Sequence, residues 1–237
     1  MGFLYKYRAC CKYTEQIFTT GCLHYSFRND FNDPYDSVVC LDRAREFYFK
    51  GVALTRDKQI EEINLTFAND QLEQIYQDVL GKLEILCLSR NGRQLQMWSH
   101  YADNHKGLCL EFDDDILRQS LGDLFDVKYN QEPYKVQLNR PDEMNEDIFK
   151  GVLCTKEKGW EYEQEVRLLR HTEKGQITNN YPFNKQALKS IYFGSQCTQR
   201  NIIKYKRLCR LNGFEHVKFY QMEIANKGKF ELVAKEI

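Results

Sequence analysis

The chain has little of several features that would place it in a special class of protein. Its 237 residues include only four prolines, and we find no repeat and no Pro/Gly-rich linker that would divide it. This length suits one large domain, so we predict a single domain spanning residues 1–237. The 34 basic and 34 acidic residues cancel. A net charge of zero argues against an extended nucleic-acid-binding surface.

Long apolar runs and ordered cysteine spacings are also missing. No apolar run approaches the roughly 20 residues that a membrane span needs. The first residues, 1–6, lack the apolar stretch of a secretory signal. The nine cysteines are scattered without a metal-ligand spacing, and their odd number fits free thiols in a reducing compartment. We therefore expect a soluble cytoplasmic protein with no membrane partner and no bound metal.

The periodicity of apolar residues predicts more strands than a regular βαβ series would contain. No G-x-G-x-x-G follows the first strand, and no Walker A sequence is present, so the usual nucleotide loops are absent. These features favour an α+β fold with a mostly antiparallel sheet and helices clustered around it. The predicted strands are 3–7, 23–27, 85–89, 107–112, 163–169, 190–194, 217–224 and 230–233. The predicted helices are 14–18, 41–52, 69–83, 113–121 and 198–212, with a rigid turn at 32–34.

The two tryptophans of the chain lie in two polar boxes. Residues 97–107 read MWSHYADNHKG, and residues 160–167 read WEYEQEVR. Trp98 and Tyr101 could stack on a planar ring, and His100 could act as an acid, a base or a hydrogen-bond donor. The plainer interpretation packs Trp98 at the edge of the core and lets His100 bond a backbone carbonyl.

The second box places charges at alternate positions. On a strand, Glu163, Glu165 and Arg167 would share one face. Adjacent carboxylates raise one carboxyl pKa while an arginine lowers the other, so the face could hold one protonated acid and one ionised partner. The plainer interpretation is a solvated strand face with cross-strand ion pairs.

Three further segments have two interpretations each. In the first strand, Tyr5, Lys6 and Tyr7 put a cation between aromatic rings, which could bind a phosphate or a base, or could form an amphipathic edge strand. The segment 89–93 could be an anion-binding loop or a polar connection. The acidic run 113–115 could belong to a metal-dependent nuclease, although a helix cap is the plainer role.

Taken together, the segments 4–7, 31–34, 87–89, 97–107 and 156–167 occur in a familiar order. In this order the chain resembles the bacterial domain-of-unknown-function family numbered 2971, over about residues 4–200. This resemblance implies a fold shared with that family and implies no activity.

The order of the boxes is also similar, more distantly, to that of the ADP-ribosyltransferase superfamily. This resemblance implies that Lys6 or Tyr7 binds NAD on the first strand and that Ser89 shapes the nicotinamide pocket. It places Glu165 at the ribose, with Glu163 as the first glutamate of an E-x-E pair. Position 6 is Lys where the superfamily has Arg or His, and Ser89 lacks the usual Ser-Thr-Ser setting.

The implied activity is that of an NAD-consuming ADP-ribosyltransferase or NAD glycohydrolase, such as a toxin or an anti-phage defence effector. A carboxylate would stabilise the oxocarbenium-like state that forms when the nicotinamide–ribose bond breaks. The catalytic residues would be Glu165, Glu163 and His100. The NAD-binding residues would be Tyr5, Lys6, Tyr7, Ser89, Trp98, Tyr101 and Arg167.

Two other functions remain open on the sequence. One is a non-catalytic module in which the tryptophan boxes stack on a nucleotide or a nucleic-acid end. The other is the metal-dependent nuclease. The acceptor of a transferred group, the macromolecular partner and the oligomeric state are not encoded in any motif that we recognise.

Overall fold

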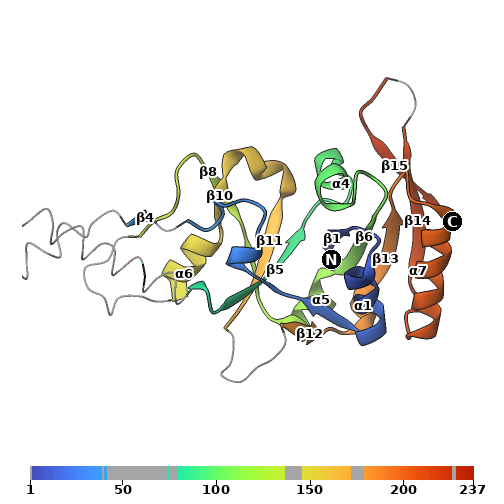
Figure 1. Ribbon diagram of the computed structural model, residues 1–237, viewed down its shortest axis with the longest axis horizontal. Helices are drawn as coiled ribbons and strands as arrows, with labels where there is room; N and C mark the ends of the chain where they lie inside the picture. The colour runs from blue at the N-terminus through green and yellow to red at the C-terminus, as the bar shows by residue number, and fades with distance from the viewer. Residues whose placement is uncertain are drawn as a thin grey trace, which may run out of the picture.

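The computed structural model describes residues 2–38, 40–41, 74, 80–136, 146–171, 179–225 and 228–237 (Figure 1). The strands are β1 (Phe3–Arg8), β2 (Cys22–His24), β3 (Ser26–Phe27), β4 (Cys40–Leu41), β5 (Leu83–Ser89), β6 (Leu108–Asp113), β7 (Leu124–Asp126), β8 (Lys128–Asn130), β9 (Lys135–Val136), β10 (Thr155–Glu157), β11 (Glu165–His171), β12 (Asn180–Pro182), β13 (Leu188–Phe193), β14 (Lys218–Ile224) and β15 (Leu232–Glu236). The α-helices are α1 (Lys12–Thr20), α4 (Leu95–Tyr101), α5 (Asp114–Leu121), α6 (Glu146–Leu153) and α7 (Gln199–Leu211). The 3-10 helices are η1 (Arg28–Asp30), η3 (Lys158–Glu163) and η4 (Lys185–Ala187).

Most of the predicted elements are present, with boundaries moved by a few residues. The helix predicted at 14–18 is α1, which ends at Gly21 because that residue adopts a left-handed φ of 68°. The helix predicted at 198–212 is α7, which begins after a Thr198 side chain that accepts a hydrogen bond from the Asn201 N–H. The strand predicted at 23–27 is divided between β2 and β3. The helices predicted at 41–52 and 69–83 lie almost wholly outside the described residues.

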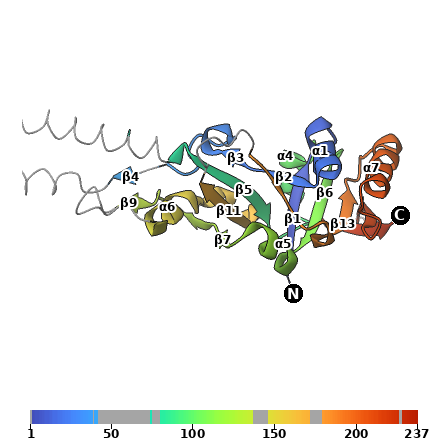
Figure 2. The same ribbon diagram turned by 90° about the horizontal axis from the view of Figure 1, so that it is seen from below.

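The α+β prediction is confirmed. One large sheet runs in the order β15-β14-β13-β6-β1-β5-β11-β7, and β3 pairs with β5 beside this path. All of its pairings are antiparallel except the one between β13 and β14. In both views α7 lies at one end of the described structure and α6 lies toward the other (Figures 1 and 2).

The two faces of the sheet bury different side chains. On β6, Leu108, Leu110 and Phe112 point into a large core that includes residues of α1 and α7. The intervening Cys109 faces the other side, where it packs in a smaller cluster with Tyr7 and residues of α4. The box 97–107 therefore covers one face of the sheet, while α1 and α7 cover the opposite face.

The acidic run 113–115 stabilises the start of α5. The Asp113 carboxylate accepts a hydrogen bond from the Ile116 N–H at 3.1 Å, and Asp114 forms an ion pair with Arg118 at 2.5 Å. Both contacts belong to a capped helix. They favour the structural interpretation over the nuclease one.

The central sheet is interrupted along one edge of β5. On this edge β3 pairs with Glu84 and Ile85, and β1 pairs at the single position Tyr5–Ser89. Neither of these pairings includes Cys87, which lies between them. A strand carbonyl left without a ladder partner needs another donor, and the Lys6 ammonium donates to the Cys87 carbonyl at 3.0 Å. The gap between β1 and β3 is thus bounded by polar groups.

No helix among the described residues is long and apolar enough to cross a membrane.

Candidate active site

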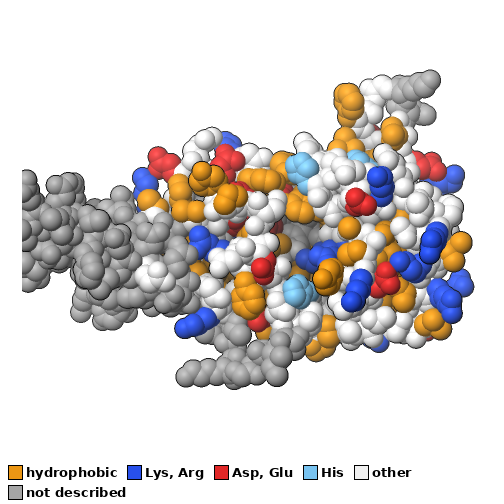
Figure 3. All heavy atoms as spheres, in the orientation of Figure 1, with side chains coloured by type: hydrophobic (Ala, Val, Ile, Leu, Met, Phe, Trp, Pro, Cys, Tyr) orange, Lys and Arg blue, Asp and Glu red, His pale blue; other side chains and the backbone are white. Residues whose placement is uncertain are grey.

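A cavity of about 400 Å³ lies at this interruption of the sheet. Strand β1, the turn around residues 30–36, helix α4 and the segment 156–167 contribute to its walls. The face drawn in Figure 3 is hollowed near its middle. Its volume falls in the range of small-molecule sites. Nine of the ten residues predicted for the site line the cavity, and Trp98 does not.

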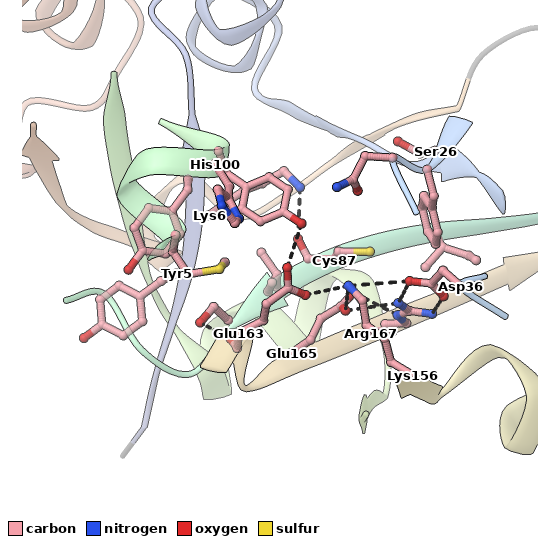
Figure 4. Close-up of a pocket in the computed structure, with 18 of the residues that line it drawn as sticks. Tyr5, Lys6, Ser26, Asp36, Cys87, His100, Lys156, Glu163, Glu165 and Arg167 are labelled. Atoms are coloured by element: carbon pink, nitrogen blue, oxygen red, sulfur yellow. Dashed lines mark hydrogen bonds and ion pairs between the residues drawn. The ribbon is translucent and has the colours of Figure 1, made fainter. Parts of the chain in front are cut away.

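A fully buried guanidinium, that of Arg167, forms the base of the site (Figure 4). Its Nε and Nη2 atoms donate to the two oxygens of Glu165 at 2.8 and 3.0 Å. Its Nη1 and Nη2 atoms donate to the two oxygens of Asp36 at 2.8 and 2.6 Å. Such two-pronged bonds fix the planes of both carboxylates. The solvated strand face considered above is therefore wrong, since Arg167 is 0% exposed and Glu165 is 6% exposed.

A second buried cation, Lys156, connects the carboxylates. Its Nζ lies 2.5 Å from Glu163 Oε2, 3.2 Å from Glu165 Oε2 and 3.5 Å from Asp36 Oδ2. It also lies 4.9 Å from the centre of the Trp160 ring. Two cations and three carboxylates thus form one buried network, and all five residues line the cavity.

The backbone places Glu163 differently from the prediction. Glu163 ends the 3-10 helix η3, and Gln164 adopts a left-handed φ of 45° before β11 begins at Glu165. The observed strand β11 therefore begins two residues later than the predicted strand 163–169, because this turn interrupts the extended backbone. The two glutamates still meet through Lys156. The Tyr101 hydroxyl donates to the other oxygen of Glu163 at 2.6 Å.

The two glutamates have carboxyl pKa values shifted in opposite directions. Burial raises the pKa of Glu163, and the neighbouring Glu165 charge adds to this effect against the opposing Lys156 ammonium. Burial would also raise the pKa of Glu165, but Arg167 and Lys156 outweigh it and lower that pKa to about 2. One carboxyl group is thus held ionised while its neighbour binds a proton more readily.

The three predicted residues of β1 lie beside this pair. Lys6 is partly buried and donates to the Cys87 carbonyl. The Tyr5 hydroxyl donates to Glu111 at 3.1 Å, and the Tyr7 hydroxyl donates to the Asn91 carbonyl at 2.6 Å. Both tyrosines line the cavity, and their hydroxyls are bonded to other groups.

Ser89 supports the turn that carries Glu163. Its hydroxyl donates to the Glu163 carbonyl at 2.6 Å and accepts from the Asn91 N–H at 3.0 Å. Strand pairing aligns Ser89 with Tyr5 on one side and with Glu165 on the other. The convergence of Lys6, Ser89 and Glu165, which the sequence left open, is thus present in the cavity.

The stacking role predicted for Trp98 is wrong. Its side chain is 0% exposed, it packs edge-to-face on Tyr7 with ring centres 5.3 Å apart, and its Nε1 donates to the Gly92 carbonyl at 3.2 Å. The indole faces the core because helix α4 lies across the sheet. The neighbouring His100 is exposed and lines the cavity, with its Nδ1 3.1 Å from the Tyr162 hydroxyl rather than at a backbone carbonyl.

Sequence reasoning assigned no role to Asp36 and quoted Lys156 only as part of a resemblance. Asp36 lies 131 residues before Arg167 in the chain. Its signal in the sequence is its place just after the Asn32-Asp33-Pro34 turn, a pattern that by itself predicts only a rigid turn. The Asp33 carboxylate does accept from the Tyr35 N–H at 2.9 Å, so the turn prediction is confirmed.

One family model matches part of the chain that forms this site. Residues 97–168 match the family model described as Protein of unknown function (DUF2971). The matched segment contains both tryptophan boxes and every cavity residue from Met97 to Arg167. Searches of curated proteins and of solved structures each gave no match.

Proposed function

We propose that this protein cleaves the nicotinamide–ribose bond of NAD, as an ADP-ribosyltransferase or an NAD glycohydrolase. The proposal is supported above all by the opposed pKa shifts of Glu163 and Glu165 in one cavity. It agrees with the resemblance to ADP-ribosyltransferases, which assigned those two positions. An enzyme that consumes NAD in this way would suit a toxin or an anti-phage effector.

In this proposal Glu165 supplies negative charge. Cleavage of the N-glycosidic bond leaves an oxocarbenium-like ribose, and a fixed carboxylate stabilises it without reorganisation. Arg167 and Lys156 keep Glu165 ionised and oriented. Nicotinamide leaves with the bonding electron pair, so its ring becomes neutral and needs no proton from the protein.

Glu163 acts as the general base. The raised pKa brings its carboxyl group closer to the range in which it can take a proton from water or from an acceptor hydroxyl. The oxygen of that nucleophile bonds to the ribose carbon as its proton passes to Glu163. Tyr101, which donates to Glu163, holds the carboxylate in place.

The remaining lining suits the rest of a dinucleotide. Lys6 and Arg8 on β1 line the cavity and carry the charge that a diphosphate requires. Tyr5, Tyr7 and His100 offer flat surfaces to rings. Trp98 has no part in this arrangement.

One observation favours a second function, that of a nucleotide-recognition module. Both oxygens of Glu165 already accept bonds from Arg167, and Lys156 bonds one of them as well. A carboxylate used in this way could serve only to hold the cavity open for a ligand.

The test is to incubate the full chain with NAD and to measure free nicotinamide and thermal stability together. We expect wild-type release, a loss of about 100-fold or more in Glu165→Gln, and a loss of about 10- to 100-fold in Glu163→Gln. Circular dichroism of each variant excludes unfolding as the cause.

A thermal shift with NAD but no nicotinamide release, with or without added protein and nucleic-acid acceptors, would favour the recognition module, because a ligand that binds only the folded state raises the melting temperature. The absence of both nicotinamide release and a thermal shift with NAD would contradict both functions.

A further inference from the structure

The cavity contains two lysines in very different surroundings. Lys156 lies within 3.5 Å of three carboxylates. Lys6 donates instead to the Cys87 carbonyl at 3.0 Å, and no carboxylate of the described residues lies within ion-pair distance of its ammonium group. An ammonium group has three N–H donors, and Lys6 lines the cavity with the Cys87 carbonyl as its hydrogen-bond acceptor among the described residues.

This difference affects how readily each amine loses its proton. Burial and the nearby Arg8 guanidinium lower the pKa of Lys6 to about 8, against the opposing effects of Cys87 on β5 and the Glu165 carboxylate on β11. The carboxylates around Lys156 raise its pKa instead, despite burial. Relative to an ordinary lysine, the neutral fraction of Lys6 near pH 7 is higher by roughly 300-fold.

We propose that Lys6 is a nucleophilic amine that forms an imine with an aldehyde or ketone carrying an anionic group. The inference does not rest on NAD cleavage. The anionic group is inferred from Arg8, whose guanidinium would bind it. Arg8 lines the same cavity, and no carboxylate of the described chain pairs with it. Its Nε donates to the Thr14 hydroxyl at 3.4 Å, which leaves the guanidinium nitrogens beyond it for a ligand.

The chemistry needs one amine and one acid. The neutral Lys6 nitrogen adds to the carbonyl carbon, and one of its protons moves to the carbonyl oxygen, which becomes a hydroxyl. That hydroxyl leaves as water when an acid protonates it, and the nitrogen lone pair forms the C=N bond of a protonated imine in place of the C–O bond. Glu163 lines the same cavity and, with its raised pKa, is the group best suited to supply this proton.

The probe is pyridoxal 5′-phosphate, which joins an aldehyde, an anionic group and a flat ring. The intact protein is treated with the probe near pH 7.5 and then with borohydride, which delivers hydride to the imine carbon and leaves a stable secondary amine. Peptide mass spectrometry then measures the labelled fraction of each lysine. Pyridoxal, which lacks the phosphate, is the matched control compound.

We expect Lys6 to be labelled first, at least about tenfold faster than Lys156 or any surface lysine, and with a rate that is half-maximal near pH 8. Lys6→Arg retains the charge and a donor for the Cys87 carbonyl but cannot form an imine, so it should lose this label while keeping its circular dichroism spectrum. Arg8→Gln should slow labelling by the phosphate compound much more than labelling by pyridoxal.

Labelling of Lys6 no faster than that of Lys156 in the folded wild type would overturn the proposal. So would retention of the fast label in Lys6→Arg. Because borohydride trapping needs no NAD, a failure here is distinguishable from a failure of the NAD-cleavage assay, and either result can occur without the other.

Discussion

The two tryptophan boxes have similar compositions, but their polar groups are used differently. In the box 97–107, Ser99 and His105 stabilise a turn, since His105 stacks on Trp98 with ring centres 6.4 Å apart and bonds Ser99 at 3.2 Å, while His100 and Tyr101 line the cavity. In the segment 156–167 the polar groups bond one another around a cavity. A mixture of Trp, His and acidic residues therefore does not by itself identify a site, because the same groups can satisfy a buried turn.

The first box is also more constrained by its backbone. The consecutive residues 103–105 all have left-handed φ angles between 48° and 64°. Gly107 follows, and a Cβ there would lie 2.2 Å from the Arg8 carbonyl oxygen. The close approach explains the glycine, and it places α4 so that His100 and Tyr101 reach the cavity.

The largest effect on the free energy of unfolding is expected in the segment 156–167, which carries the buried charges. Arg167→Met leaves the buried carboxylates of Glu165 and Asp36 without their main partner, which should lower the free energy of unfolding by about 4–5 kcal/mol. Urea denaturation measures this change. Arg118→Met is the matched control, because the Arg118 side chain is 36% exposed and pairs with Asp114 near the surface. We expect about 0.5 kcal/mol for it; equal losses in both variants would mean that Arg167 does not organise the network.

The two tryptophans should differ in the next test. Trp98→Ala removes a fully buried ring and should cost about 3–4 kcal/mol in unfolding free energy. Trp160 is only partly buried beside Lys156, so Trp160→Ala should cost about 1 kcal/mol. Urea denaturation of the pair measures both. A larger loss for Trp160 would reverse the structural assignment of the boxes.

Acidification should lower the stability of the fold through Glu165 in the segment 156–167. The pKa of Glu165 is lowered from 4.5 to about 2, so its ionised form stabilises the fold above pH 4.5 and this stability is lost as the pH falls toward 2. Each pH unit in that window costs up to about 1.4 kcal/mol per proton taken up. The pKa of Glu163 is raised, so its contribution to stability is present at low pH and is lost as the pH rises through that pKa. Urea midpoints between pH 5 and 2 should fall less steeply in Glu165→Gln; an identical slope would contradict the shift.

The smallest effect concerns single hydrogen bonds. Ser99→Ala removes the bond to His105 inside the first box and should cost about 1 kcal/mol. Tyr162→Phe removes the exposed bond to His100 and should change the unfolding free energy by less than about 0.5 kcal/mol. Thermal unfolding of both variants tests the order, and a greater loss in Tyr162→Phe would show that the exposed bond matters more.

Local patterns were enough to identify most elements. Short apolar runs located β5 and β6, and the acidic residues 113–115 located the start of α5. These signals act between residues a few positions apart, so they are present in the amino-acid order alone. The left-handed turn at Gln164 carried no such signal, and for this reason Glu163 was assigned to the strand.

The composition of the cavity depends on tertiary pairing. Strand register brings Glu165 beside Ser89 and Arg167 beside Cys87, and the turn after η1 brings Asp36 to Arg167 across 131 residues. The burial that separates the pKa values of Glu163 and Glu165 exists only once these segments pack together. The direction of the Trp98 ring also depends on tertiary packing, because helix α4 lies over the sheet with Trp98 toward Tyr7 and Cys109.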